Sequence, residues 1–368
     1  MNFSFYNPVK IIRDKLENIG SLFKGRKTLL VTSPSFVRNG IVDTLVKKYP
    51  EIIQVIDDIM PNPDFDHLRK NWIKVYAFSQ SFELILAVGG GSVLDSAKVF
   101  SVSNSEKKFH FVENLIKGKR AKEDYRLIPM ILIPTTAGTG SEVTPWATVW
   151  DNREMKKYSL HLPDLWAEAC FLDPELTFNL PLPVTLSTGL DALSHALESL
   201  WNKNRNPVST LYAVTASQKI LDTLPKLIEN PLSLPLREKM LDASLKAGLA
   251  FSNTQTALAH AVSYDLTIRF GIPHGTACSF TLPDIIDSVS GQDREIDQAL
   301  FQIFKEKGSS SIRNFFKKLG VSTCWKDYGL TQKDMQETKE SLKTVSRAGN
   351  SLVDSEKFFK IIEKQFNI

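Results

Sequence analysis

The sequence predicts a mixed fold, with an N-terminal α/β domain over residues 1–180 and an all-helical domain over residues 181–368. In the first half of the chain, apolar runs rich in β-branched residues alternate with helical patterns. Such alternation is typical of a parallel sheet covered by helices on both faces. From about Leu182 the strand signals stop, and the apolar residues recur at helical spacing.

The elements of the first half follow one another as strand and helix. Strands are predicted at 26–33, 51–57, 82–88 and 126–134, and helices at 36–48, at 63–79 and directly after Ser92. In the second half, helices are predicted around 187–201, 208–222, 236–252, 254–264, 276–288, 294–319, 331–345 and 354–366. A change of composition near residue 180 therefore marks the domain boundary.

Composition narrows the class of protein. The 368 residues are enough for two cores, and 45 Lys and Arg against 41 Asp and Glu give a formal net charge of +4. Only residues 117–122 form a basic block, so no nucleic-acid partner is expected. Three widely spaced cysteines indicate a reducing compartment, and no apolar run reaches 18 residues. We expect a cytoplasmic enzyme with no membrane partner.

One candidate chemical feature is the stretch GLDALSHALE, which has the apolar spacing of a helix. Asp191 and His195 are four residues apart, so their side chains leave one face of that helix, one turn from each other. A carboxylate and an imidazole in that arrangement are two of the ligands that a divalent metal needs. A helix that pairs an Asp with a His for capping or packing explains the same two residues.

Two further histidines follow on apolar segments. His260 is predicted in the middle of an apolar helix, and His274 at a helix start or tight turn because Gly271, Pro273 and Gly275 surround it. Asp191, His195, His260 and His274 would together make a set of one carboxylate and three imidazoles for Zn²⁺ or Fe²⁺. A histidine buried in a core with its hydrogen bonds satisfied is the plainer explanation of His260.

Two loops of small residues each follow a predicted strand. Gly89-Gly90-Gly91-Ser92 lies between a strand and a helix, and Thr135 to Gly140 ends a later strand. Glycines let backbone N–H groups approach a phosphate closely, and the start of a helix favours an anion. The first loop has neither the GxGxxG nor the P-loop pattern, so a tight strand-to-helix turn explains it as well. Together, at the carboxyl ends of parallel strands, they favour a dinucleotide.

The motifs GGGSVLDSAK, PTTAGTGSE, GLDALSHALES and HAVSY…GIPHG occur in the order and spacing of one family, and they span the chain from about residue 5 to 290. The chain resembles the iron-containing (group III) alcohol dehydrogenases. The resemblance implies an N-terminal Rossmann-like domain, an all-α C-terminal domain and a cleft between them, an architecture shared with dehydroquinate synthase. It also implies one divalent metal, Fe²⁺ or alternatively Zn²⁺, held by Asp191, His195, His260 and His274. A homodimer is expected, as dimers are common in the family.

The resemblance also assigns the cofactor, NAD(H) or NADP(H), to particular positions. Gly89, Gly90, Gly91 and Ser92 with Asp95 would hold the pyrophosphate side. Thr135, Thr136, Thr139 and Ser141 would line the cofactor, and Lys157 stands where the family has a lysine near the cofactor ribose.

Two positions depart from the family pattern. Where many members have an Asp that holds the adenosine ribose and excludes a 2′-phosphate, this chain has Ser33. Without that carboxylate NADPH becomes an acceptable cofactor. Four residues after His260, a family His often assigned to proton relay is replaced by Tyr264. A phenol can still donate a hydrogen bond, so Tyr264 is the candidate catalytic proton donor.

The sequence of residues 198–207 and the motif HAVSY…FGIPHG resemble those of a branch of phosphonoacetaldehyde reductases. A phosphonate needs cationic partners, for which Lys203, Arg205 and Arg269 are candidates. Solvated surface charges at a helix end explain them equally simply. The predicted activity is reduction of a small aldehyde such as phosphonoacetaldehyde to the alcohol. The alternatives are another short-chain alcohol dehydrogenase, a dehydroquinate synthase-like lyase and a non-catalytic binding protein.

Overall fold

The computed structural model describes residues 3–77, 81–119, 125–306 and 308–366, and the chain divides into two compact units. The sheet unit comprises Asn7–Thr136 and Ser141–Thr177, and the helical unit comprises Met1–Tyr6, Ala137–Gly140 and Phe178–Ile368. Both units therefore contain segments that are not contiguous in the sequence. Residues 120–122 of the predicted basic block, and 78–79 of a predicted helix, lie outside the described residues.

The centre of the sheet unit is a six-stranded sheet in the order β1-β10-β7-β4-β2-β3, and every neighbouring pair is parallel. Its strands are β1 (Lys10–Arg13), β2 (Thr28–Thr32), β3 (Ile52–Ile56), β4 (Leu84–Gly89), β7 (Met130–Pro134) and β10 (Ala169–Leu172). Two short antiparallel pairs accompany it: β5 (Val102–Ser103) with β6 (Arg126–Leu127), and β8 (Trp146–Asp151) with β9 (Lys156–His161). Its helices are α1 (Pro34–Arg38), α2 (Ile41–Lys48), α3 (Phe65–Ala77), α4 (Gly91–Ser101) and α5 (Phe109–Ile116).

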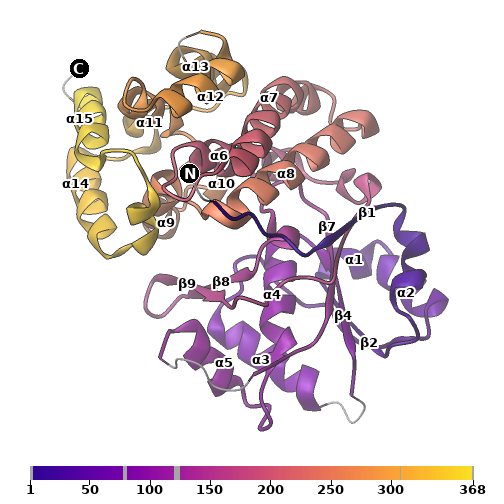
Figure 1. Ribbon diagram of the computed structural model, residues 1–368. Coiled ribbons are helices and arrows are strands. Elements are labelled where there is room, and N and C mark those ends of the chain that lie inside the picture. The colour runs from indigo at the N-terminus through magenta and orange to yellow at the C-terminus, as the bar shows by residue number, and fades with distance from the viewer. Residues whose placement is uncertain (1–2, 78–80, 120–124, 307, 367–368) are drawn as a thin grey trace. The chain divides into compact units, whose positions relative to one another are not determined.

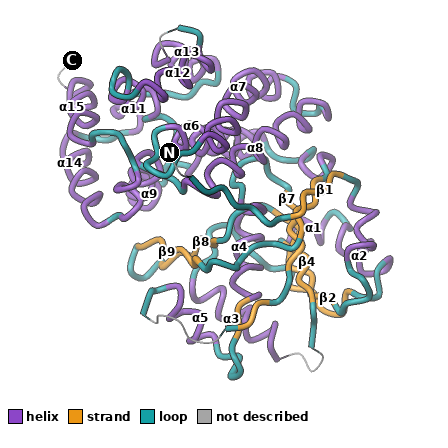
Figure 2. The backbone as a smooth tube through the Cα atoms, viewed as in Figure 1, coloured by secondary structure: helices purple, strands orange, loops and turns teal. Residues whose placement is uncertain are grey.

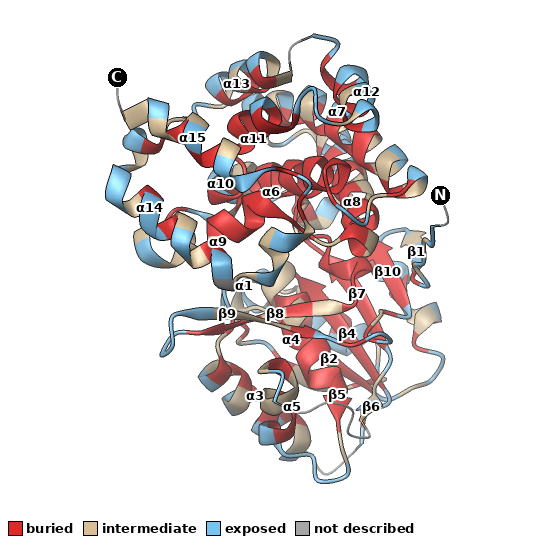
Figure 3. Cartoon of the chain, turned by 60° about the vertical axis from the view of Figure 1, so that its left-hand side comes forward, coloured by how far each residue is buried: buried red, intermediate tan, exposed pale blue. Residues whose placement is uncertain are grey.

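The middle strands are buried on both faces, which is why their sequences read as continuous apolar runs. Successive side chains point to opposite faces, so Leu84, Leu86 and Val88 join a cluster with residues of α1 and α2. Figure 1 shows α1 and α2 on one side of β2, β4 and β7, and α3, α4 and α5 on the other. The middle strands β2, β4 and β7 are coloured as buried in Figure 3.

The strand order reverses direction beside β2. The chain runs outward from β2 to β3, and β4 then pairs with the other side of β2 before β7 and β10 continue that way. In open α/β sheets such a reversal opens a crevice at the carboxyl ends of the two strands, where ligands bind. The loops after β2 and β4 flank this point.

The helical unit is built almost entirely from helices (Figure 2). They are α6 (Leu182–Leu200), α7 (Pro207–Glu229), α8 (Leu234–Thr254), α9 (Leu258–Phe270), α10 (His274–Ala277), α11 (Leu282–Val289), α12 (Arg294–Phe304), α13 (Gly308–Lys318), α14 (Gln332–Ser341) and α15 (Ser355–Phe366). α6 is the central one, and every residue from Gly189 to Leu200 is buried. A helix buried all round can hold polar side chains only where they find partners inside the protein.

Several predicted helices are interrupted. The helix expected at 36–48 is two helices, because Gly40 adopts a left-handed φ of +77°. Similarly, 276–288 and 294–319 each divide into two helices, and the second break follows the left-handed Lys305. Periodicity did not predict β1, β10 or the β8–β9 hairpin. No helix in the described part of the chain has the length and apolar character needed to cross a membrane.

Candidate metal and cofactor sites

Three polar side chains lie along the buried face of α6. Asp191, His195 and Glu198 occupy positions i, i+4 and i+7, and they are 4%, 6% and 0% exposed. Residues at this spacing share one face of a helix. Burial of an acid, an imidazole and a second acid on one helix demands partners from other elements.

His260 and His274 are those partners, and each stands near the start of its helix. His260 is the third residue of α9, so the prediction that it lies mid-helix is wrong; α8 ends at Thr254 and α9 begins only at Leu258. His274 opens α10, as predicted. Beside it, Gly275 lies so close to α6 that a Cβ there would be 1.7 Å from the Ser187 carbonyl oxygen. Glycine at this position therefore allows His274 to approach α6.

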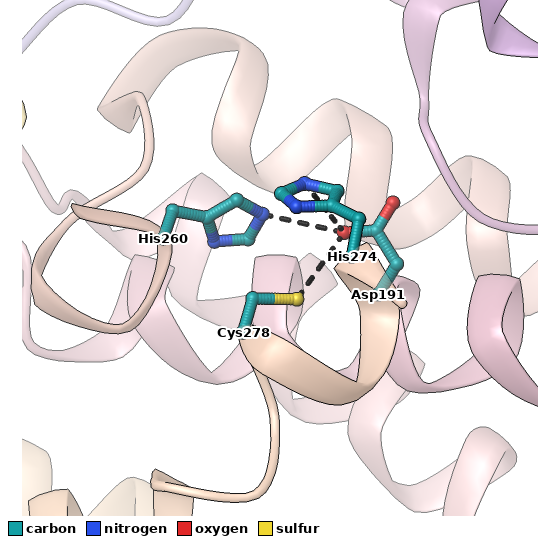
Figure 4. A group of neighbouring side chains, drawn as sticks. All are labelled: Asp191, His260, His274 and Cys278. Carbon is teal, nitrogen blue, oxygen red and sulfur yellow. Dashed lines mark hydrogen bonds and ion pairs between the residues drawn. The ribbon is translucent and has the colours of Figure 1, made fainter. Parts of the chain in front are cut away.

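The three imidazoles converge on one carboxylate oxygen. The distances from Asp191 Oδ1 to the Nε2 atoms of His260, His195 and His274 are 3.3, 3.7 and 3.9 Å. Figure 4 shows His260 and His274 directed at Asp191. Four ligand atoms placed about 2.1 Å from a tetrahedral ion lie roughly 3.4 Å apart. The four side chains thus have the donor chemistry and the spacing of a site for Fe²⁺ or Zn²⁺.

The other nitrogen of two of these rings is hydrogen-bonded to the protein. His195 Nδ1 lies 3.2 Å from the Gly138 carbonyl oxygen, and His260 Nδ1 lies 2.5 Å from Glu198 Oε2. Such bonds fix the ring orientation and direct Nε2 to the centre of the site. The sequence reasoning missed Glu198, although its i+7 spacing from Asp191 on an apolar helix was a usable signal.

The charges at the site are strongly coupled. Burial opposes ionisation of Asp191, but the surrounding imidazoles, His195 first, outweigh it and hold the pKa of this carboxyl below its usual range. Burial lowers the pKa of His195 to about 4, so its imidazole is neutral at pH 7. For His260 burial acts in the same direction, but Glu198 and Asp191 outweigh it and raise the pKa to about 9. A cation binding here therefore displaces a proton from His260.

Cys278 is a further polar neighbour of Asp191, and the sequence did not indicate that it lies at this site. Its Sγ lies 3.5 Å from Asp191 Oδ1 and 3.4 Å from the Gly275 carbonyl oxygen (Figure 4). One ligand atom from each of Asp191, His260, His274 and Cys278 lies within 4.8 Å of the others. Burial raises the pKa of the thiol well above its usual value, which disfavours the thiolate that binds metals.

Several residues predicted to bind the cofactor stand at the carboxyl ends of strands of the sheet. Ser33 directly follows β2, Gly89 ends β4, and Thr135 follows β7. The strand register pairs Thr32 with Val88 and Gly89 with Pro134, so these loops are neighbours. A Cβ at Gly89 would lie 2.5 Å from the Val93 side chain, so glycine lets α4 begin immediately after the strand.

Two of the predicted cofactor residues have internal partners. Asp95 accepts hydrogen bonds from Ser141 Oγ at 2.6 Å and from the Thr148 backbone N–H at 2.9 Å. Asp95 therefore links α4 to β8 and to the segment before it. Sequence reasoning missed the buried Lys98, whose Nζ donates to the carbonyl oxygens of Ser141 and Trp146 at 2.6 and 2.8 Å. Through these contacts Asp95 and Lys98 on α4 hold the segment around Ser141 in place.

The remaining cofactor candidates are Thr136, Thr139 and Lys157. Thr136 lies against Gly90, where a Cβ would be 3.2 Å from its methyl group. Thr139 belongs to the short segment that groups with the helical unit. Lys157 Nζ lies 5.3 Å from the centre of the Trp150 ring. Their roles toward a nucleotide stay predictions.

Two of the three predicted substrate cations, Arg205 and Arg269, are paired with acids. Arg205 donates to Asp293 and Glu295 at 2.7 and 3.1 Å. Arg269 pairs with three carboxylates, those of Asp265, Asp334 and Glu337. Lys203 is exposed and, with Arg205, lines a hollow of about 960 Å³. Tyr264 is half-buried on α9, one turn after His260.

Known proteins share both units of this chain. The sequence pattern of iron-containing alcohol dehydrogenases matches residues 8–174, and that of the family's C-terminal domain matches residues 185–361. Long-chain-alcohol dehydrogenase 1 of Geobacillus thermodenitrificans is 34% identical over 77% of this chain and 70% of its own length. Sulfoacetaldehyde reductase of Bilophila wadsworthia is 28% identical over 91% of both chains.

Two solved structures have the same fold along the whole chain. Sulfoacetaldehyde reductase from Bifidobacterium kashiwanohense, in complex with NAD⁺, is 28% identical and covers 99% of both chains with a TM-score of 0.87. An iron-containing alcohol dehydrogenase from Thermotoga maritima is 32% identical over all of both chains, with a TM-score of 0.84. The one-acid, three-histidine cluster and the glycine loop at the sheet edge thus occur in a chain that belongs to the iron-containing alcohol dehydrogenase family.

Proposed function

We propose that the chain is a metal-dependent, NAD(P)H-linked aldehyde reductase that converts a small aldehyde such as phosphonoacetaldehyde into its alcohol. The convergence of three imidazole Nε2 atoms on Asp191 Oδ1, at 3.3 to 3.9 Å, is the observation that carries the proposal. A purely structural cluster has no need to direct all three Nε2 atoms at one carboxylate oxygen. The family supports an alcohol dehydrogenase acting on alcohols or aldehydes.

Asp191, His195, His260 and His274 would hold the ion, Fe²⁺ or Zn²⁺. A bound divalent ion supplies a Lewis acid that draws electron density from a carbonyl group. The protein's part is electrostatic and geometric: Asp191 contributes the negative charge, and the ring contacts with Gly138 and Glu198 orient two of the imidazoles. Tyr264 is the proposed proton donor, since a phenol one turn from His260 on α9 can donate at neutral pH.

Nicotinamide chemistry would come from NADH or NADPH, which supplies the hydride. Gly89 to Ser92, where α4 begins, offers backbone N–H groups to an anion. Ser33, at the adjacent strand end, has a neutral side chain that does not repel a 2′-phosphate. We therefore propose that NADPH is accepted as well as NADH.

The substrate proposal is an aldehyde carrying a compact anion. Two relatives are sulfoacetaldehyde reductases, whose substrate has a sulfonate where phosphonoacetaldehyde has a phosphonate. Arg269 is the weakest of the predicted anion-binding residues, because three carboxylates already surround it. Lys203 is exposed, whereas Arg205 is partly buried. Sulfoacetaldehyde is the second candidate substrate, on the strength of these relatives.

The test is a screen of NADH and NADPH oxidation after loading with Fe²⁺ or Zn²⁺, against phosphonoacetaldehyde, sulfoacetaldehyde and uncharged short aldehydes. The proposal expects turnover that requires the metal, with the anionic aldehydes preferred. Preference for uncharged aldehydes would point to another short-chain alcohol dehydrogenase. Metal-loaded protein that gives no net cofactor oxidation with any aldehyde would overturn the proposal and favour the lyase alternative. The homodimer and the cytoplasmic location stay predictions.

A further inference from the structure

We propose that Glu198 is a positioning residue of the metal site, which selects the tautomer of His260 and fixes where α9 begins. This inference rests on the proposed metal-dependent function. Glu198 is 0% exposed and lies on α6, seven residues after Asp191. It contacts a ligand rather than the ion, so its role is to prepare His260 for binding.

Both oxygens of this carboxylate are used. Oε2 accepts from His260 Nδ1 at 2.5 Å, and Oε1 accepts from the backbone N–H groups of Ala259 and His260 at 2.5 and 3.2 Å. A proton held on Nδ1 leaves the Nε2 lone pair free, and Nε2 lies 3.3 Å from Asp191 Oδ1. The hydrogen bond thus selects the one neutral tautomer that can bind a metal through Nε2.

The start of α9 gives an independent reason to assign this role. Its N-cap residue, Ala257, has no side chain able to cap the helix, and the first N–H groups of a helix lack partners within it. Glu198 supplies the acceptor from another helix, and a negative charge at a helix start is stabilising. One side chain therefore fixes both the backbone and the ring of His260.

The negative charges of Asp191 and Glu198 also match the positive charge of a divalent cation. Asp191 and Glu198 are two buried acids on one face of α6, and a divalent cation would compensate both. With a cation bound, His260 lies between it and Glu198, an arrangement in which a carboxylate orients the imidazole and increases its basicity as a ligand.

Glu198→Gln separates the tautomer role from the capping role. The amide oxygen can still accept from the two backbone N–H groups, but the amide nitrogen then faces His260 Nδ1 and pushes the ring proton onto Nε2. We expect affinity for Zn²⁺, measured on demetallated protein by competition with a chromophoric chelator, to fall by about 10- to 100-fold. The unfolding temperature of the demetallated variant should stay near that of the wild type, whereas Glu198→Ala should lower it.

The matched control is Asp284→Asn on α11, another fully buried carboxylate, which pairs with Arg313 and Gln365. It should leave Zn²⁺ affinity unchanged. In the wild-type protein loaded with Zn²⁺, long-range ¹H–¹⁵N spectra should show the His260 proton on Nδ1; this measurement needs no variant to fold. A Glu198→Gln protein that binds Zn²⁺ like the wild type, or a ring proton found on Nε2, would overturn the proposal. A wild-type protein that binds no metal would instead overturn the proposed function and this inference with it.

Discussion

Asp191 is the residue on which the proposed metal site depends, because all three imidazoles face the same oxygen of its carboxylate. Asp191→Asn keeps the shape of the side chain and removes its charge. Since removal of a group that only supports a ligand already costs 10- to 100-fold in metal affinity, we expect a loss of at least about 100-fold. Metal content after dialysis measures it. Asp222→Asn, at an exposed pair with Lys226, should retain the metal.

Ser33 is the position that we propose sets cofactor choice. A carboxylate there would accept the ribose hydroxyls of NADH and repel the 2′-phosphate of NADPH. We expect Ser33→Asp to shift the ratio of kcat/KM for NADH over NADPH upward by about 10-fold or more, an effect of roughly 1.4 kcal/mol. Ser33→Asn has the same shape without the charge and should leave the ratio near that of the wild type. An unchanged ratio in the Asp variant would refute the cofactor argument.

At this scale the sequence predicts four metal ligands that the structure brings together, but it does not predict the residues that contact them. Glu198 has a usable i+7 spacing from Asp191, but neither Glu198 nor Cys278 has its contact partner within its own motif. Their roles depend on which helix packs against which: Glu198 meets α9, and Cys278 meets Asp191, over separations of 62 and 87 residues. Local patterns carry no information on such pairings.

Among the elements, the packing of α10 against α6 depends on a single residue, Gly275. A Cβ at Gly275 would lie 1.7 Å from a carbonyl oxygen of α6, a clash that only movement of the backbone can relieve. We expect Gly275→Ala to destabilise the helical unit by about 1–3 kcal/mol and to weaken Zn²⁺ binding through the adjacent His274. Urea unfolding and chelator competition measure the two effects. Gly349→Ala, where a Cβ meets no atom within 4 Å, is the control and should change neither.

The sequence predicts best those helices and strands whose apolar residues form a long, regular pattern. The apolar spacing of α6, α7 and α8 and the buried runs of β2 and β4 identified them, although the boundaries differ by several residues. Strand β10 is only four residues long, and the β8–β9 hairpin carries polar residues, so neither has a strong local signal. The break at Gly40 depends on one left-handed residue, which periodicity does not detect.

For the molecule as a whole, buried acids set a pH dependence of stability. Glu142 is 2% exposed, and burial raises its pKa to about 7 from 4.5. The folded protein therefore binds this proton more tightly than the unfolded chain, so the group's contribution to stability falls as the pH rises from about 4.5 to 7. The change is on the order of 3 kcal/mol.

Glu142→Gln removes that ionisation. We expect the urea midpoint of the variant to fall less than that of the wild type between pH 5 and pH 8. The difference between the two proteins should be largest at pH 8. Glu238→Gln, on α8 and exposed, should follow the wild-type curve. Parallel curves for Glu142→Gln and the wild type would show that this carboxyl ionises freely in the folded state.

Because each unit contains segments that are separate in the sequence, no single cut in the gene yields the two units as separate fragments. A cut near residue 180 looks natural from composition, yet the helical unit also takes in Ala137–Gly140. The Gly138 carbonyl in that segment is the partner of His195 Nδ1. A fragment expressed from residue 181 onward would carry every ligand and still lack the acceptor that orients one of them. Adding the N-terminal fragment back in trans should restore metal retention, which makes the chain a candidate for a split-protein reporter.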